Sequence, residues 1–318
     1  MIEELKKRPT YISIDLDALE HNFNIIKNFV APAQMMPIVK GNAYGHGMIE
    51  CAQHLEKIGS QWLGVALLEE GIALRKAGIT VPIVVLGGIL HRQIELFLHY
   101  DLDINAASVD KLKAIESHAQ HARKRARVHL EIDTGIERTG IHYYNAHKLI
   151  DYAATTKWCD IIGIFSHFAT GEDQDLSFAY TQLERFKESV TNRTTIFNTQ
   201  PLLHMAASGA ILQLKESHFD MVRPGLLMYG IAPAPHLQGI LDLQPVMSLS
   251  SRVVYFKVVK EGAGVSYGLT WKAPRDTRVI TVPLGYGDGY NRQFMHGGHV
   301  IIRGKRYPIV GRICMDQF

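Results

Sequence analysis

Cysteine is scarce in this sequence. The 318 residues include three cysteines, Cys51, Cys159 and Cys314, which are odd in number and far apart. A disulfide framework needs paired cysteines, so this pattern argues against one and indicates a reducing compartment.

Long apolar runs and a secretion signal are also missing. The longest run, Val81–Leu90, has ten residues and contains two glycines, so it is too short to span a bilayer. The basic Lys6-Lys7-Arg8 segment is followed by no apolar core, because Asp15 and Asp17 interrupt it. We therefore expect a cytoplasmic protein with no membrane partner.

Neither sign of charge dominates. The chain has 34 Lys and Arg against 31 Asp and Glu, so nothing marks it as a binder of nucleic acid. The basic run Arg123–Arg127 has no interleaved aromatic residues and is typical of a solvated helix end. His118 and His121 have helical spacing, but no third ligand is suggested near them, so no metal site is predicted.

The first helical pattern lies near the N-terminus. Asp17 is predicted to cap it, with Glu20 three residues later, and Pro32 follows its end. A second helix is predicted from Ser108, whose side chain suits an N-cap.

Short, buried, β-branched runs alternate with such helical patterns, which is typical of parallel strands. We predict eight of them, at Met36–Val39, Trp62–Leu67, Ile83–Leu86, Leu102–Ala106, Val128–Ile132, Asp160–Ser166, Leu202–Ala206 and Phe219–Val222. Eight strand–helix units favour a closed (β/α)₈ barrel. An open doubly wound sheet is the weaker alternative, because no switch point is evident.

The pattern changes after about Ile240. Runs such as Ser251–Val259 and Arg278–Leu284 are β-rich, with no helical period between them. We predict a barrel over residues 11–240, a mostly β domain over 241–318, and an N-terminal strand within 1–10 that joins the β domain.

A lysine ends the first predicted strand, in the segment "VKGNAYGHG". Lys40 follows Met36–Val39 directly and precedes three glycines, a tyrosine and a histidine. An ordinary surface lysine on a turn is the usual interpretation of such a residue. The alternative is an amine at the mouth of a site.

Other polar residues also follow barrel strands at the face where barrel enzymes place their sites. They are Arg138 after strand 5, His167 after strand 6, Ser208 after strand 7, and Arg223 with Gly225 after strand 8. Each alone has an ordinary structural explanation. Together they indicate a site for an anionic ligand with an amine nucleophile. Glycine-rich turns suit a phosphate, and a lysine beside a phosphate suggests a Schiff base to pyridoxal phosphate.

At this point the chain resembles a known family, the alanine racemases, over essentially its whole length. The motifs that carry the resemblance are "VKGNAYGHG", "DTGIERTG", "SHFA", "VRPGLLMYG", "GVSYG", "GYGDGY" and "VGRICMDQ", and their order and spacing are highly specific.

The resemblance implies racemisation of L- and D-alanine on pyridoxal 5′-phosphate, which supplies D-alanine for peptidoglycan. It implies two bases, Lys40, which also forms the Schiff base, and Tyr267 from the partner subunit of a homodimer. The cofactor would contact Tyr44, His167, Ser208, Arg223, Gly225 and Leu226. Arg138 and Met315 would bind the substrate, with Glu131, Tyr286 and Asp316 in support.

The chain departs from the family pattern in three places. Glu131 stands where many relatives have a lysine that becomes carbamylated, and Ala207 where many have an asparagine. The chain also ends at Phe318, before the family's last strands, so we expect a C-terminal truncation.

Three other functions were weighed. A serine or broad-range amino-acid racemase would use the same residues. A basic amino-acid decarboxylase shares the barrel and cofactor but would want a carboxylate in place of Arg223. A non-catalytic pyridoxal-phosphate carrier protein shares the barrel but lacks the β domain.

Overall fold

The structure is a computed structural model that describes residues 8–191 and 194–318. It divides into two compact units, one of residues 15–246 and one that joins the chain up to Ile14 with residues 247–318. These divisions lie a few residues beyond positions 10 and 240. Of the strand predicted within 1–10, residues 1–7 lie outside the described part of the chain.

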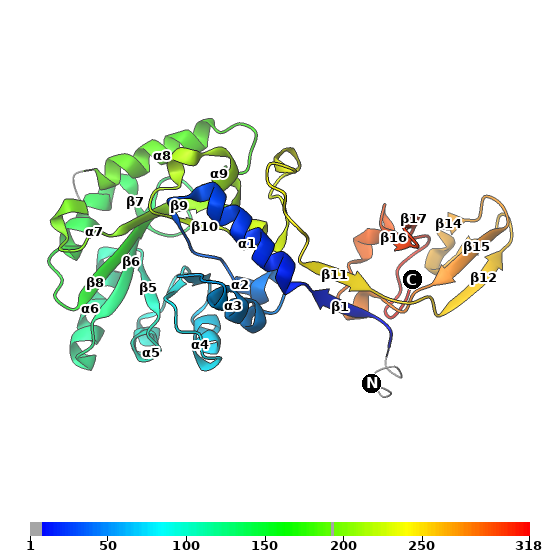
Figure 1. The fold of residues 1–318 in the computed structure, drawn as a ribbon, viewed down its shortest axis with the longest axis horizontal. Helices are drawn as coiled ribbons and strands as arrows, with labels where there is room; N and C mark the ends of the chain where they lie inside the picture. Colours follow the sequence, from blue (N-terminus) through cyan, green and yellow to red (C-terminus); the bar gives the residue numbers. More distant parts are fainter. Residues whose placement is uncertain (1–7, 192–193) are drawn as a thin grey trace. The chain divides into compact units, whose positions relative to one another are not determined.

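The first unit is built on a ring of parallel strands, coloured blue to green-yellow in Figure 1. In ring order they are β2 (Gln34–Met35), β10 (Met221–Arg223), β9 (Leu202–Ala207), β8 (Cys159–Phe165), β6 (Ala126–Asp133), β5 (Asp103–Ala106), β4 (Ile83–Val85) and β3 (Leu63–Val65). A parallel bridge between Ile38 and Gly64 joins the first of these strands to the last. The ring is therefore closed. A short strand, β7 (Ile141–His142), adds to β6.

Helices connect these strands, and Figure 1 shows α4 to α8 around the outside of the sheet. Their bounds are α1 (Leu16–Val30), α3 (Met48–Lys57), α4 (Leu68–Lys76), α5 (Ile94–His99), α6 (Val109–Ala122), α7 (Ala146–Ala153), α8 (Ser177–Val190) and α9 (Ser208–Gln213). The segment labelled α2 (Lys40–Tyr44) is a left-handed turn.

The helix starts test two predicted caps. Ser108 is confirmed, because its hydroxyl accepts a hydrogen bond from the Lys111 amide at 3.1 Å. The prediction that Asp17 is the N-cap is wrong, because Asp15 caps α1 by accepting a hydrogen bond from the Ala18 amide at 3.0 Å. The helix begins at Leu16, so Asp17 already lies in the first turn, where its charge still suits the helix dipole.

Seven of the eight predicted strands overlap observed ones. The first is wrong: Met36–Val39 lies just after β2, and within it only Ile38 makes a strand bridge. The start of the last predicted strand also needs correction. Phe219 lies outside β10 because its φ of 46° is left-handed and incompatible with a strand. Inside the ring, small residues make room for larger ones. A Cβ on Gly64 would lie 2.5 Å from the Ile38 side chain, and one on Gly163 would lie 2.4 Å from His129.

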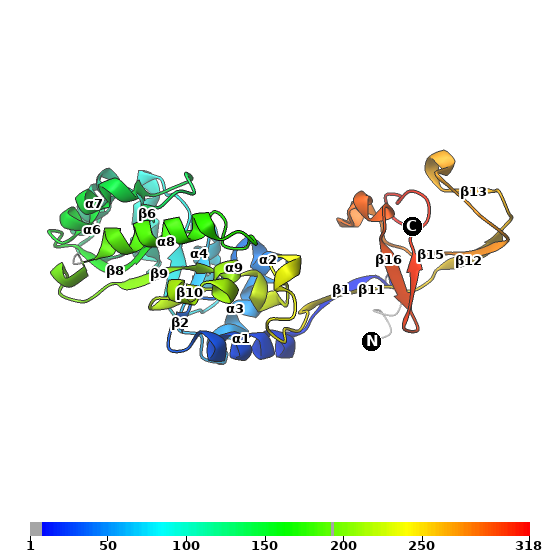
Figure 2. The same cartoon turned by 90° about the horizontal axis from the view of Figure 1, so that it is seen from above.

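The second unit consists of antiparallel two-stranded ribbons, several of which are labelled in Figure 2. The pairs are β1 (Tyr11–Ile14) with β11 (Met247–Ser250), β12 (Tyr255–Val259) with β15 (Thr277–Thr281), β13 (Gly264–Val265) with β14 (Trp271–Lys272), and β16 (His299–Ile302) with β17 (Lys305–Pro308). The predicted fold class, an α/β barrel followed by a mostly β domain, is confirmed. Among the described helices, none combines the length and apolarity that crossing a bilayer requires.

Candidate active site

A cavity of about 670 Å³ opens at the carboxyl ends of the barrel strands. Its lining brings together every barrel residue that the sequence nominated. They are Lys40, Tyr44, Glu131, Arg138, His167, Ser208, Arg223, Gly225 and Leu226. The functional face of the barrel is therefore where parallel-strand topology places it.

Lys40 and Tyr44 are the two ends of the left-handed turn. Gly41, Asn42, Ala43 and Tyr44 have φ between 54° and 61°. For residues with a Cβ this backbone costs about 1–2 kcal/mol each, so surrounding contacts must hold it. The Asn42 side chain accepts from the Met48 amide at 2.9 Å and supplies one such contact.

The Lys40 amine lies in a largely cationic setting. Partial burial lowers its pKa, and the positive charges of Arg138 and Arg223 lower it further, whereas Glu70 raises it. A lowered pKa increases the neutral fraction of the amine, and the neutral amine is the nucleophile.

Arg223 is almost completely buried, at 3% exposure, and its two terminal nitrogens are fully committed. Nη1 donates to Nδ1 and the carbonyl of His204, at 2.8 and 2.9 Å. Nη2 donates to the carbonyls of Ser166 and Met205 and to Nδ1 of His167, at 2.7, 3.0 and 3.1 Å. None of the described residues accepts from Nε–H, which leaves one donor for a ligand. Burial lowers the pKa of Arg223 to about 10, so it stays charged at neutral pH.

A chain of buried side chains runs from Arg223 through the barrel interior. Arginine can only donate, so Nδ1 of His204 must accept, and its Nε2–H then donates to Nδ1 of His129 at 2.9 Å. Nε2–H of His129 then faces the Asp103 carboxylate at 3.3 Å. Both tautomers follow from this geometry. His204, His129 and Asp103 are not predicted from the sequence. The available signal is a polar residue in the middle of a strand that is otherwise buried.

The histidines nearest Arg223 are held neutral. Burial lowers the pKa of His167 to about 3, helped by the charges of Arg223, Arg138 and Lys40. Complete burial lowers the pKa of His204 well below its usual value, and Arg223 adds to that shift.

We expect this to make barrel stability depend on pH. The unfolded chain protonates His204 near pH 6.5 and the folded chain does not, so the free energy of unfolding should fall as pH falls below about 6.5. The slope is about 1.4 kcal/mol per pH unit for one histidine. Urea unfolding followed by far-UV circular dichroism at pH 7.5 and 5.5 measures it. His204→Asn should reduce the slope, and an unchanged slope would contradict the assignment.

Tyr44, Ser208 and Gly225 form a tight cradle at one end of the cavity. The Gly225 amide donates to the Ser208 hydroxyl at 3.0 Å, and a Cβ on Gly225 would lie 2.5 Å from the Tyr44 hydroxyl oxygen. The Leu226 amide donates to no acceptor among the described residues. Hydroxyl and amide donors from three segments therefore converge on a space suited to an anion.

Glu131 is buried, at 5% exposure, so it is not a strand-end acid that faces solvent. Its Oε1 accepts from the Thr139 hydroxyl at 2.7 Å, and Oε2 accepts from the Asn105 amide group at 2.6 Å. It makes no direct ion pair with Arg138 within the described chain. Instead it holds the residue next to Arg138.

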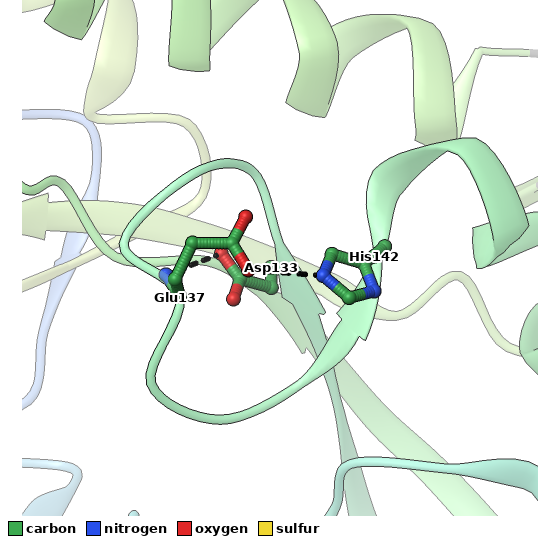
Figure 3. A group of neighbouring side chains, drawn as sticks. All are labelled: Asp133, Glu137 and His142. Atoms are coloured by element: carbon green, nitrogen blue, oxygen red, sulfur yellow. Dashed lines mark hydrogen bonds and ion pairs between the residues drawn. The ribbon is translucent and has the colours of Figure 1, made fainter.

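The segment on either side of Arg138 contains a possible cation cluster, Asp133, Glu137 and His142, drawn in Figure 3. Asp133 already accepts from the amides of Gly135, Ile136 and Glu137. His142 lies 3.0 Å from the Glu137 carboxylate. These bonds account for the cluster as a brace of the loop.

The remaining nominated residues belong to the second unit. Tyr267 is 72% exposed on a short 3-10 helix, η8 (Tyr267–Leu269). The Tyr286 amide donates to the Cys314 carbonyl at 3.0 Å, and the Gly287 amide donates to the Met315 carbonyl at 2.7 Å. Arg8 donates to the Asp316 carbonyl at 2.7 Å. Tyr286, Met315 and Asp316 thus form one local group.

Two family models match this chain. "Alanine racemase, N-terminal domain" matches residues 14–233, and "Alanine racemase, C-terminal domain" matches residues 246–318. Among curated relatives, the alanine racemase of Halothermothrix orenii is 38% identical over 311 residues, which cover 98% of this chain and 82% of the relative. That of Desulforamulus reducens is 39% identical over 315 residues, 98% of this chain and 85% of the relative.

Solved structures agree. The alanine racemase of Streptomyces lavendulae superimposes with a TM-score of 0.92 at 33% identity, covering 98% of this chain and 83% of that one. The Bacillus anthracis alanine racemase, solved with bound L-Ala-P, gives 0.87 at 32% identity, covering 98% and 81%. The chain belongs to the alanine racemase family.

Proposed function

We propose that this chain interconverts L- and D-alanine with pyridoxal phosphate, the cofactor on which its family depends. The observation that carries the proposal is the single cavity in which the Lys40 amine, the one free donor of Arg223 and the anion cradle lie together. The test is D-alanine formation from L-alanine by the purified chain with cofactor added. L-Serine in parallel measures the alternative of a broad-range racemase.

The lining residues fit the cofactor. The hydroxyls of Tyr44 and Ser208 and the Leu226 amide would hold its phosphate, with Gly225 leaving room beside them, and Lys40 would bind it covalently. When bound, the cofactor supplies the electron sink that acidifies the hydrogen on the substrate α-carbon. Arg223 would donate its Nε–H to the ring nitrogen. This role is supported by the lack of any acceptor for Nε–H among the described residues.

Arg223 also bears on the choice of reaction. Its pKa of about 10 keeps the guanidinium protonated, so it donates a hydrogen bond without giving up its proton. A guanidinium that keeps its proton would leave the ring nitrogen of a bound cofactor unprotonated, and the weaker electron withdrawal that results would favour return of a proton to the α-carbon. A decarboxylase would want a carboxylate at this position, so racemisation is the better fit.

Racemisation needs two groups on opposite faces of the α-carbon. Lys40 Nζ exchanges the proton on one face, and the partner's Tyr267 exchanges it on the other through its hydroxyl. The 72% exposure of Tyr267 in its own unit supports this role, because the side chain is free to enter another subunit. The enzyme would then be a homodimer with shared sites.

Substrate binding falls to Arg138, which lines the cavity and has no ion pair within the described chain. Its guanidinium suits the alanine carboxylate. The resemblance assigns the Met315 backbone to the same carboxylate, Tyr286 to the site entrance and Asp316 to a supporting role. The carrier-protein alternative has no use for Tyr267. The physiological role is cytoplasmic supply of D-alanine for peptidoglycan.

Glu131→Gln tests how Arg138 is held. A glutamine cannot accept equally from Thr139 and Asn105, so the Thr139–Arg138 segment should loosen. We expect the KM for alanine to rise about tenfold, with a smaller fall in kcat. Steady-state kinetics measure both, with Glu188→Gln, an exposed position on α8 away from the cavity, as the matched control. Kinetics equal to those of the wild type would exclude the role.

Bicarbonate distinguishes this carboxylate from a carbamylated lysine. The wild-type activity should not respond to added bicarbonate, because the Glu131 carboxyl group is part of the side chain and is not formed from dissolved carbon dioxide. Glu131→Lys should become bicarbonate-dependent. A bicarbonate response in the wild type would contradict the interpretation.

A further inference from the structure

Glu70 lies at the start of α4, outside the set of residues nominated from the sequence. Its Oε1 accepts from the Gly41 amide at 2.6 Å. Its Oε2 accepts from the amides of Ala66 and Leu67, at 2.9 and 3.0 Å. One carboxylate thus links the segment that follows β2 to the segment that follows β3.

The hydrogen bond to the Gly41 amide affects the position of the whole left-handed turn. Gly41 is the first residue with left-handed geometry, directly after Lys40, and the left-handed run continues through Tyr44 to Gly45. A left-handed turn has little intrinsic stability in an L-amino-acid chain, so its position depends on outside contacts. Whatever holds Gly41 therefore also sets where the Lys40 amine and the Tyr44 hydroxyl lie in the cavity.

We propose that Glu70 is a positioning residue for Lys40. By accepting a hydrogen bond from the Gly41 amide, it holds the left-handed turn in place. Lys40 and Tyr44, at the two ends of that turn, are then both positioned to contact the cofactor. The inference rests on the proposed function only in taking Lys40 and Tyr44 as cofactor ligands.

The contacts require a carboxylate at this position. Both oxygens accept, and together they receive three amide hydrogens. Glutamine has one acceptor oxygen, so its amino group would face an N–H on one side. Since two amides lie on the Ala66–Leu67 side and one on the Gly41 side, Glu70→Gln should keep the former and lose the latter.

The charge of Glu70 has a second effect. Four groups act on or face the Lys40 amine: Arg138 after β6, Arg223 on β10, Glu70 on α4, and His167, which stays neutral. The two arginines lower the pKa of Lys40, and Glu70 opposes them. Removing the Glu70 charge should therefore lower the pKa further and move the neutral amine to lower pH.

Cofactor uptake by the apoprotein tests the proposal without requiring activity. The neutral Lys40 amine condenses with the cofactor aldehyde: a carbon–nitrogen double bond forms, and the aldehyde oxygen leaves as water with two amine hydrogens. Stopped-flow absorbance gives the rate as a function of pH. Glu70→Gln should lower the high-pH rate about tenfold and shift the midpoint to lower pH. Glu70→Asp keeps the charge but shortens the reach, so its rate should fall while the midpoint stays.

Glu69→Gln is the matched control, because Glu69 is the exposed neighbour on the same helix turn, and it should leave rate and midpoint unchanged. Wild-type behaviour of Glu70→Gln would overturn the proposal. So would a slower rate with an unmoved midpoint, since that marks a merely stabilising residue. If Glu70→Gln fails to fold by circular dichroism, a wild-type rate in Glu70→Asp overturns the inference. If the wild type takes up cofactor on a lysine other than Lys40, the proposed function itself fails.

Discussion

Replacing Lys40 by alanine is expected to lower the racemisation rate by about 10⁴-fold or more. The change removes both the group that holds the cofactor and one of the two proton-transfer groups, and a general base alone contributes about 10²–10⁴-fold. The residual rate is measured as D-alanine formed from L-alanine at saturating cofactor. The fold should survive, because Lys40 is exposed at the cavity wall and has no hydrogen-bonding role for its amine within the described chain.

Covalent trapping identifies the lysine independently of rate. Borohydride reduction of the wild-type holoprotein, followed by peptide mapping, should place the cofactor on the peptide that contains Lys40. The control is Lys57→Ala, at the exposed end of α3, which should retain activity within about twofold. An adduct on another lysine, or an active Lys40→Ala enzyme, would remove the central element of the proposed function.

Tyr267→Phe is expected to cost about 10²–10⁴-fold in racemisation while leaving cofactor attachment intact. The phenol oxygen is lost, but the ring and the backbone of η8 remain. In deuterated water, exchange of the α-hydrogen should stop for L-alanine and persist for D-alanine, because Lys40 still serves its own face. Proton NMR of each enantiomer measures this directly.

Two further experiments serve as controls for the Tyr267→Phe prediction. Tyr255→Phe changes another exposed tyrosine of the same unit, at 59% exposure, and should not alter the rate. Mixing Lys40→Ala with Tyr267→Phe under subunit exchange should restore activity, because a hybrid dimer contains one site with both groups intact. Without such restoration, Tyr267 does not act across subunits. Full racemisation by Tyr267→Phe would mean that the second base is another residue.

Much of the fold was accessible from local pattern. The runs Ile83–Leu86 and Val128–Ile132 are buried strands because β-branched residues favour extended backbone, and the periodic stretches between such runs form helices around them. The Asp17 prediction failed for a local reason as well. The chain leaves β1 at Ile14 and turns immediately, so Asp15 meets the first free amides.

For the candidate site, sequence order also predicts which residues come together. Lys40, His167 and Arg223 follow strand ends, and parallel strands deliver their ends to one face, so sequence order alone brings these residues together. The same logic covers Ser208 and Arg138, which also follow barrel strands.

Tertiary structure alone decided how those residues are held. The left-handed turn from Gly41 to Tyr44, the Glu70 carboxylate beneath it, and the contacts of Glu131 all depend on segments distant in the sequence. The hydrogen-bonded series of side chains from Asp103 through His129 and His204 to Arg223 depends on them too. The sign of φ in such a turn, and the hydrogen-bond partners of each side chain, depend on which polar groups are left unpaired when distant segments pack together. Local propensity does not contain that information. The sequence by itself determined the barrel, its β domain and the chemistry of the rim; packing determined the geometry of each donor and acceptor.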